Sequence, residues 1–369
     1  MTDTRHAVFL PDPMDELMTR LSVLLVFVGF TAMGCVNPPG VGTFDSDAGD
    51  VDEWESVDEA VAGDWYYKPM DETVCANGSS AGLGLNVGDD SRDLVVYLSG
   101  GGACWDAVSC RHFRFAANLD EDYHSGRMAE EIQPLFDAGL FDRDADVNPW
   151  PEGSYAFIPY CTGDLHTGRK ETTYGGFGGG KVVRHYGHDN MGYFLDELPE
   201  LFPDVERVWL VGISAGGYGA SWNFSRFRRA FPDAELHLYA DASPWLPVEE
   251  ERWSDWRDNW DPEIPAGCDR CAGSPEMLAD HLAQTYPESR FALSVFLRDP
   301  VLSAYLGEMP GSVESSIKTF VAEHWSHDNT RAFVAEGREH EALLMLGDGV
   351  ESTDGDDLAA FLDRWVAGW

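Results

Sequence analysis

The sequence predicts an α/β fold in which helices cover both faces of a mostly parallel sheet. Two observations lead to this prediction. Short apolar runs of strand length alternate with longer segments of helical periodicity, and a glycine-rich turn lies directly between one such run and one such segment. With 369 residues, of which 44% are hydrophobic, the chain can bury a full core as a single domain of this class.

The strands are predicted from apolar runs. The first is "DLVVYLSGGG", where a strand enters a glycine turn, and "SYAFIPYC" and "VERVWLVG" follow it. The later runs "AELHLYAD", "RFALSVFLRD" and "TRAFVAEG" complete the sheet. In residue numbers, strands are expected within 93–102, 154–161, 205–212, 234–241, 290–299 and 330–337.

Helices are predicted between these strands, where apolar residues recur at helical spacing. The segments are 189–202, 217–229 and 274–287, and an amphipathic helix closes the chain at 356–369. Residues 338–349, between the last strand and the closing helix, are expected to form a loop.

The N-terminal segment predicts export. Arg20 precedes an uncharged, mainly apolar run that is shorter than the ~18 residues a membrane span needs, a pattern typical of a secretory signal. The run ends at Gly34-Cys35, which resembles a bacterial lipobox, so residues 1–35 are expected to form a signal peptide with lipidation at Cys35. Simple secretion is the alternative. Residues before Met18 are interpreted as an over-extended start rather than as structure.

Composition and charge set further limits. Residues 36–60 are rich in Pro, Gly and acidic residues, which predicts a disordered tether before a folded domain at 61–369. The chain has 65 acidic and 25 basic residues, a formal net charge of −40. Such a surface repels nucleic acids and anionic lipids, so we expect no nucleic-acid partner and membrane contact only through the N-terminal lipid. A monomer is expected.

The cysteines indicate an oxidising compartment outside the cytoplasm. Without Cys35 six remain, an even number that suits three disulfides. These six candidates are Cys75, Cys104, Cys110, Cys161, Cys268 and Cys271. Short spacings favour the pairs Cys104–Cys110 and Cys268–Cys271. Cys268 and Cys271 could instead be redox-active or form half of a zinc site. No second cysteine pair at this spacing accompanies them to complete such a site, so we expect no metal and no other cofactor.

The chemistry is centred on "VWLVGISAGGYGAS", residues 208–221. A Gly-x-Ser-x-Gly match is weak by itself, but here Ser214 ends a predicted strand and precedes a predicted helix. This is the context of a nucleophile elbow, in which Gly212 and Gly216 permit close backbone approach and the turn lifts the hydroxyl above the sheet. Ser214 is therefore the predicted nucleophile.

A serine nucleophile needs a base, and the base needs an orienting acid. In α/β hydrolases the chain order is Ser, then Asp or Glu, then His. Asp299 ends the strand within 290–299, and His340 follows the last strand, so both side chains are expected beside Ser214. Asp241, at the end of 234–241, is the alternative acid.

A glycine triplet supplies candidate oxyanion donors. Residues 100–102 directly follow the first predicted strand, as the glycine-rich motif does in lipases and esterases, and Ala215 offers a second amide source. The alternative is a tight turn stapled by Cys104. Further along, His166 is a candidate for the pocket wall or for the surface.

The segments "LVVYLSGGGACW", "IPYCTGD" and "GISAGGYGA", together with the pairing of Asp299 and His340, resemble the pectin acetylesterase family, which includes the Notum carboxylesterases. The resemblance runs from about residue 65 to the C-terminus, and with the lipobox it suggests a bacterial member. It implies Ser214 as nucleophile, Asp299 as acid and His340 as base. It also implies oxyanion donors at Gly101, Gly102 and Ala215.

The sequence departs from the family where Ala103 and Cys104 stand between the glycine triplet and Trp105, which leaves the acyl pocket open. Trp105, His166 and Tyr218 are its candidate residues. We expect an exported serine carboxylesterase that hydrolyses acyl esters, most simply acetyl esters, of a polysaccharide or small ester. The alternatives are a fatty-acyl deacylase of the Notum type and a non-catalytic binding protein on a hydrolase scaffold.

Overall fold

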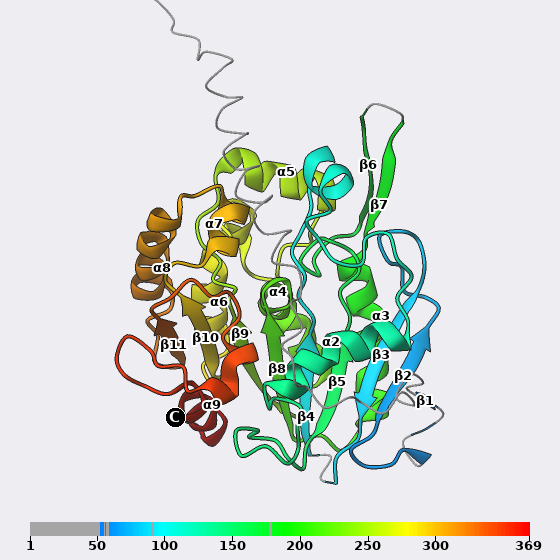
Figure 1. Cartoon of the computed structure of the whole chain (residues 1–369), viewed down its shortest axis with the longest axis vertical. Helices are drawn as coiled ribbons and strands as arrows, with labels where there is room; N and C mark the ends of the chain where they lie inside the picture. The colour runs from blue at the N-terminus through cyan, green and yellow to red at the C-terminus, as the bar shows by residue number, and fades with distance from the viewer. Residues whose placement is uncertain (1–51, 55, 57–58, 90–91, 177–178) are drawn as a thin grey trace, which may run out of the picture.

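A nine-stranded sheet forms the centre of the molecule (Figure 1). The computed structural model describes residues 52–54, 56, 59–89, 92–176 and 179–369. The sheet has the order β1-β2-β3-β5-β4-β8-β9-β10-β11. Its strands are β1 (Asp52–Glu53), β2 (Trp65–Met70), β3 (Ala81–Asn86), β4 (Asp93–Leu98), β5 (Ser154–Ile158), β8 (Arg207–Ile213), β9 (Glu235–Asp241), β10 (Phe291–Phe296) and β11 (Thr330–Ala335).

The strands from β5 through β11 in this order pair in parallel, whereas β3 is antiparallel to both of its neighbours. Parallel strands need crossover connections, and the helices of the molecule supply them. The predicted α/β class with a mostly parallel sheet is confirmed. The six predicted strands are all present, and only their ends differ by a few residues.

Alternation along the strands sends side chains to two cores. In β4, Leu94, Val96 and Leu98 belong to the core beneath α3 (Gly187–Leu201), α4 (Ala215–Ala230) and α6 (Met277–Thr285). Val95 and Tyr97 belong to the opposite core, beneath α2 (Ser125–Asp137), α9 (Leu358–Ala367) and the 3₁₀ segment η4 (Leu343–Asp348). Both faces of β4 are therefore buried, which explains why its sequence is almost continuously apolar.

Several elements had no counterpart in the sequence prediction. They are β2, β3, the hairpin β6 (Lys170–Tyr174) and β7 (Lys181–His185), the π-helical turn η2 (Val108–His112), α5 (Glu250–Trp260), η3 (Asp269–Ala272), α7 (Pro300–Leu306) and α8 (Pro310–His324), besides α2. Figure 1 shows the hairpin projecting from the upper end of the molecule, near α5. The expected loop at 338–349 contains η4, which packs into the core under α9.

The predicted tether at 36–60 extends too far. Asp52 and Glu53 pair in parallel with β2, and the Trp54 amide donates to the carbonyl of Tyr67 at 3.1 Å. The Trp54 ring also packs edge-on against Tyr66. Strand pairing and a half-buried ring were hidden by the acidic composition of this segment. The predicted signal peptide with Cys35, and the tether up to residue 51, lie outside the described residues.

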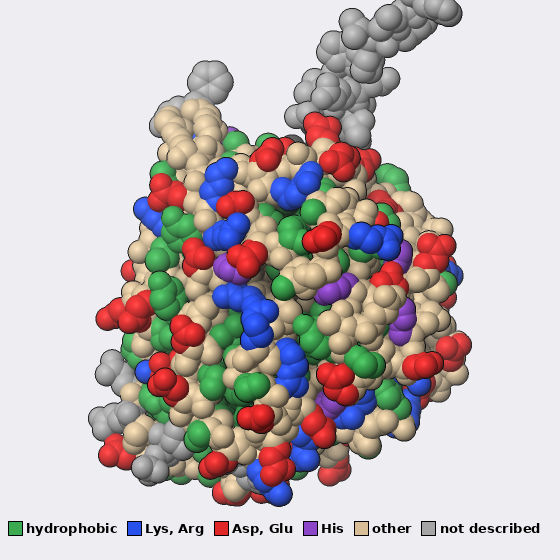
Figure 2. Space-filling view, turned by 180° about the vertical axis from the view of Figure 1, so that it is seen from behind, with side chains coloured by type: hydrophobic (Ala, Val, Ile, Leu, Met, Phe, Trp, Pro, Cys, Tyr) green, Lys and Arg blue, Asp and Glu red, His purple; other side chains and the backbone are tan. Residues whose placement is uncertain are grey.

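The surface and the cross-links agree with the sequence expectations. Figure 2 shows acidic side chains spread over one whole face, with Lys and Arg in smaller groups among them. In the described part of the chain no helix is long and apolar enough to cross a membrane. The disulfides are Cys75–Cys161, Cys104–Cys110 and Cys268–Cys271, so both pairs favoured by spacing are confirmed.

Candidate active site

Ser214 lies on a sharp turn between β8 and α4. Its backbone has φ 53° and ψ −122°, a strained conformation for a residue other than glycine. The turn is fixed by the Ser214 amide, which donates to the Asp241 carbonyl at 2.8 Å, and by close packing against the end of β4. A Cβ atom on Gly216 would collide with the Leu98 and Ser99 carbonyls, so this position accepts only glycine.

A chain of hydrogen bonds joins the three predicted catalytic side chains. The Ser214 Oγ is 2.8 Å from His340 Nε2, and His340 Nδ1 is 2.6 Å from Asp299 Oδ2. Asp299 is fully buried, and Ser214 is 7% exposed. In neutral His340 the Nδ1–H donates to the carboxylate, which leaves the Nε2 lone pair free to accept the serine proton.

Asp299 combines two roles at the end of β10. Its Oδ1 accepts the amides of Val301 and Leu302, at 2.8 and 3.0 Å, and so caps α7. Because Oδ1 is held by these two donors, Oδ2 is directed at His340. The capped helix thereby fixes the orientation of the carboxylate.

The charges around His340 favour its protonated form. Burial lowers the pKa of His340, but the carboxylate of Asp299 more than offsets this, with smaller contributions from Glu341 and Asp241, so the pKa lies above its ordinary value. A base with a raised pKa accepts a proton more readily, provided that the pH keeps it neutral beforehand.

The predicted oxyanion donors are backbone amides beside Ser214 in the sequence or in the pocket: Gly102 and Ala215 line the same pocket as Ser214, and Gly101 precedes Gly102. Gly101 and Gly102 have φ values of 133° and 77°, and Ala215 is the first residue of α4. Within the described residues none of these three amides donates to a protein acceptor. The α4 N-terminus adds its dipole, so the arrangement can stabilise a developing oxyanion.

Asp241, the alternative acid, does not contact His340. Its Oδ1 accepts the Ser294 hydroxyl at 2.6 Å, and its Oδ2 accepts the Leu343 amide at 2.9 Å. Burial raises the pKa of Asp241 to about 7, although these hydrogen bonds and the Ala342 amide lower it in part. Asp241 therefore anchors the segment that follows His340 instead of orienting the imidazole.

An apolar pocket of about 510 Å³, including space open to solvent, adjoins Ser214 and His340. Its remaining lining comes from residues 102–103, from residue 165, from the first turn of α4, from residues 245–248 and from α5 and α7. These residues are Gly102, Ala103, Leu165, Ala215, Tyr218, Trp245, Leu246, Val248, Trp256, Val301, Leu302, Tyr305 and Leu306. The Tyr218 hydroxyl is bonded to the Pro244 carbonyl at 2.9 Å, so its ring offers an apolar face.

Two predicted pocket residues lie elsewhere. Trp105 is not part of the lining. Its ring packs against those of Trp256 and Tyr305, with ring centres 5.6 and 6.0 Å away, respectively. His166 is 3% exposed and stacks on Tyr160. Its Nε2 lies 2.9 Å from the Ser99 carbonyl, and burial lowers its pKa to about 4, so the neutral ring donates this hydrogen bond beneath the glycine triplet.

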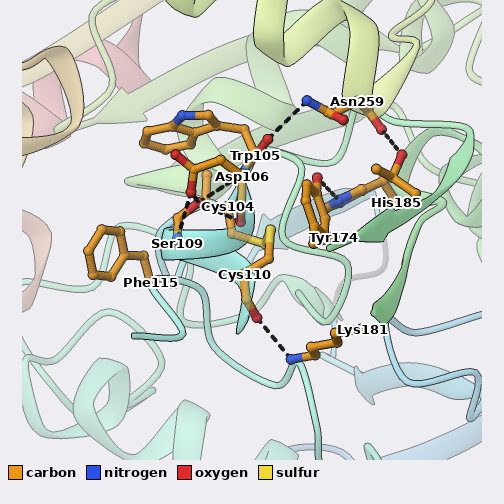
Figure 3. The surroundings of a disulfide bond; sticks show 12 residues. Cys104, Trp105, Asp106, Ser109, Cys110, Phe115, Tyr174, Lys181, His185 and Asn259 are labelled. Carbon is orange, nitrogen blue, oxygen red and sulfur yellow. Dashed lines mark hydrogen bonds between the residues drawn. A yellow bond between two sulfur atoms is a disulfide. The ribbon is translucent and has the colours of Figure 1, made fainter. Parts of the chain in front are cut away.

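The Cys104–Cys110 disulfide lies next to Ala103, which lines the pocket, and to Trp105, whose ring packs against two lining residues. Figure 3 shows it beside Trp105, whose carbonyl accepts the Asn259 amide at 2.9 Å. Both sulfurs lie within 4.8 Å of a ring nitrogen of His185. The sulfurs are bonded to each other, and His185 Nε2 pairs with the Tyr174 hydroxyl at 2.8 Å, so this group offers no ligand set for a metal.

Comparison with known proteins shows where the similarities lie. A protein-family model described as Pectinacetylesterase matches residues 64–259, which include Ser214. Palmitoleoyl-protein carboxylesterase NOTUM from Homo sapiens is 26% identical over 198 residues, which is 50% of this chain and 37% of the relative. The protein of the same name from Drosophila melanogaster is 27% identical over 256 residues, which is 60% of this chain and 35% of the relative. The matches thus span about a third of the length of these curated relatives.

A solved structure of the Wnt deacylase Notum from Drosophila superimposes with a TM-score of 0.58. The sequence identity is 19%, and the superposition covers 82% of this chain and 93% of that chain. At this identity the likeness concerns the fold, which is α/β-hydrolase-like as predicted.

Proposed function

Because the chain belongs to the pectinacetylesterase family, we propose that it is a serine carboxylesterase that removes an apolar acyl group through an acyl-enzyme intermediate. The observation that carries the proposal is the hydrogen-bonded chain from Ser214 through His340 to Asp299, which adjoins an apolar pocket that Gly102 and Ala215 also line. The disulfides support an exported protein, and lipidation at Cys35 remains part of the proposal.

In the proposed reaction, His340 Nε2 takes the Ser214 proton as Oγ attacks the ester carbonyl. The tetrahedral oxyanion is held by the amides of Gly101, Gly102 and Ala215, and Asp299 stabilises the imidazolium. His340 then gives its proton to the leaving alcohol, and the acyl group stays on Ser214. Water, deprotonated by His340, repeats the attack and releases the acid.

The pocket supports an acyl group longer than acetyl. Apart from Ser214 and His340 its lining is aliphatic, aromatic or glycine, and Trp245, Trp256 and Tyr305 form large parts of it. Each methylene buried in such surroundings contributes about 0.8 kcal/mol. The curated relatives, named palmitoleoyl-protein carboxylesterases, support the same choice. A second candidate is an acetyl ester of a neutral saccharide, which the family description favours.

The test is hydrolysis of p-nitrophenyl esters from acetate to palmitate. We expect the highest kcat/KM above acetate and a loss on the order of 10⁶-fold in Ser214→Ala. Ser225→Ala, a buried serine of the same helix α4 outside the pocket lining, is the matched control and is expected to keep wild-type rates. A maximum at acetate would select the saccharide deacetylase. Failure of the wild type to hydrolyse any ester would leave the non-catalytic binding protein.

A further inference from the structure

The oxyanion loop, residues 100–103, depends on one side chain that the sequence did not reveal. The Tyr305 hydroxyl accepts the Ala103 amide at 3.2 Å and donates to the Phe115 carbonyl. Phe115 belongs to the segment that runs alongside the loop, where the Ala117 amide donates to the Gly101 carbonyl at 2.8 Å. Tyr305 therefore joins the loop to the segment that supports it.

The space around the hydroxyl is tightly determined. Gly102 has φ 77°, and a Cβ atom there would collide with the Tyr305 hydroxyl and the Phe115 carbonyl. Burial raises the pKa of Tyr305 to about 12, so the hydroxyl keeps its proton and can donate to Phe115. The glycine at 102 and the tyrosine at 305 thus occupy complementary space, and a shift of the hydroxyl would move the loop.

Tyr305 also belongs to the helix that holds the catalytic acid. Asp299 caps α7, and Tyr305 lies near the end of the same short helix. Arg252 donates to the Tyr305 carbonyl, and the Arg252 guanidinium lies 5.3 Å from the centre of the Trp105 ring, which packs against the Tyr305 ring. The position of Tyr305 is therefore fixed by the acid at one end of α7 and by Arg252 and Trp105 at the other.

The ring of Tyr305 lines the acyl pocket, beside Gly102 and Ala103. We propose that Tyr305 is a positioning residue that sets the oxyanion loop and links occupation of the acyl pocket to it. An acyl chain that packs on the ring presses the hydroxyl against the loop and orders the Gly101 and Gly102 amides. This inference rests on the proposed esterase function. Its consequence is that chain length changes kcat, and not KM alone, because the oxyanion exists only in the transition state.

The test is Tyr305→Phe, which removes one oxygen atom and keeps the ring in the pocket. We expect kcat to fall about 10-fold for the preferred ester, less than the roughly 10²–10³-fold expected when an oxyanion donor is deleted. KM should stay within about 2-fold, because the amides act on the transition state. Inhibition by a trifluoromethyl ketone with the same acyl chain, which forms a tetrahedral oxyanion on Ser214, should weaken by the same factor as kcat.

The matched control is Tyr155→Phe. The Tyr155 hydroxyl also donates to a carbonyl, that of Trp150 at 2.8 Å, and accepts an N–H, that of Asn148 at 2.9 Å, but it lies on β5 outside the pocket lining. A purely structural role predicts that both variants lose thermal stability while kcat and ketone inhibition stay at wild-type levels. That result in Tyr305→Phe would overturn the proposal.

A second measurement compares kcat across a series of acyl lengths in the wild type and in Tyr305→Phe. The proposal expects kcat to rise with acyl length until the pocket is filled, and expects this rise to flatten in Tyr305→Phe. A wild-type kcat independent of chain length, with KM alone varying, would overturn the link. Reaction of Ser214 with a fluorophosphonate, absent in Ser214→Ala, tests the esterase function separately. If the wild type neither reacts with the fluorophosphonate nor hydrolyses esters, the proposed function fails. If the wild type does both and Tyr305→Phe has the same kcat and ketone inhibition, only this inference fails.

Discussion

Asp299→Asn is the most discriminating substitution, because the structure determines how the asparagine must sit. Asp299 Oδ1 accepts two amides of α7, so the amide oxygen of asparagine has to take that place. The NH₂ group then faces His340 Nδ1, where the carboxylate now accepts a hydrogen bond. Two donors cannot share that contact, so His340 must adopt the tautomer protonated on Nε2. That tautomer has no lone pair for the Ser214 proton.

The expected loss in kcat is roughly 10⁴-fold, equivalent to about 5.4 kcal/mol, as for wrong-tautomer variants of other catalytic triads. The assay is ester hydrolysis at a pH where wild-type activity has reached its plateau. Asp280→Asn is the control. Asp280, like Asp299, is a carboxylate hydrogen-bonded to histidine, with His324 and His327 each at 2.8 Å, but it lies outside the pocket lining. Activity of Asp299→Asn within about 10-fold of wild type would refute the assignment of Asp299 as the acid.

Four further outcomes are expected. Activity should be lost as the pH falls through the raised pKa of His340, so the midpoint of the acid limb of kcat/KM should lie above about 6.5. A midpoint below that value would contradict the argument that nearby carboxylates raise this pKa. Asp241→Asn should lower kcat far less than Asp299→Asn, because Asp241 contacts the segment after His340 and not the ring; equal losses in parallel assays would reopen the choice of acid. Leu246→Trp should fill the pocket and abolish turnover of long-chain esters while acetate is still cleaved, which a chain-length series would show. Replacing Cys104 and Cys110 by serine should lower the free energy of unfolding by about 2 kcal/mol in denaturant titrations, because the disulfide closes a short loop. A loss above about 4 kcal/mol would point to contacts beyond loop closure.

The sequence predicted the sheet and the meeting of Ser214, His340 and Asp299 because each of these features has a local signature. A buried parallel strand is recognisable as a continuous apolar run, and a residue at its carboxyl end lies at the same edge of the sheet as its counterparts on neighbouring strands. Ser214, Asp299 and His340 all follow such runs, on β8, β10 and β11. Their meeting is therefore a consequence of strand order, and the order itself is typical of the fold.

The pocket was predicted poorly because its walls come from connecting segments. Trp245 and Leu246 follow β9 in a stretch without regular structure, and Trp256 lies on a helix whose charged residues hide its apolar side. Trp105 was chosen for its nearness to the glycine triplet, but its ring packs against Trp256 and Tyr305, and these two residues line the pocket instead. Nearness in sequence to a catalytic motif does not by itself place a side chain in the site.

The strand-end residues were predictable from the sequence and the pocket wall was not, for the same physical reason, and that reason also concerns the choice of substrate. The proposed reaction uses atoms held at strand ends, where backbone pairing fixes positions closely, so the proposed type of chemistry follows from patterns in the sequence. In the proposed reaction the acyl group would contact α5, α7 and the segment 245–248, whose mutual packing depends on long-range contacts such as that of Arg252 with Tyr305. Tyr305 is where the two meet, since it lines the pocket and also bonds the oxyanion loop. If acyl length changes kcat through this residue, substrate choice in this chain is determined partly at the catalytic step, and changes in the pocket wall will alter rate and specificity together.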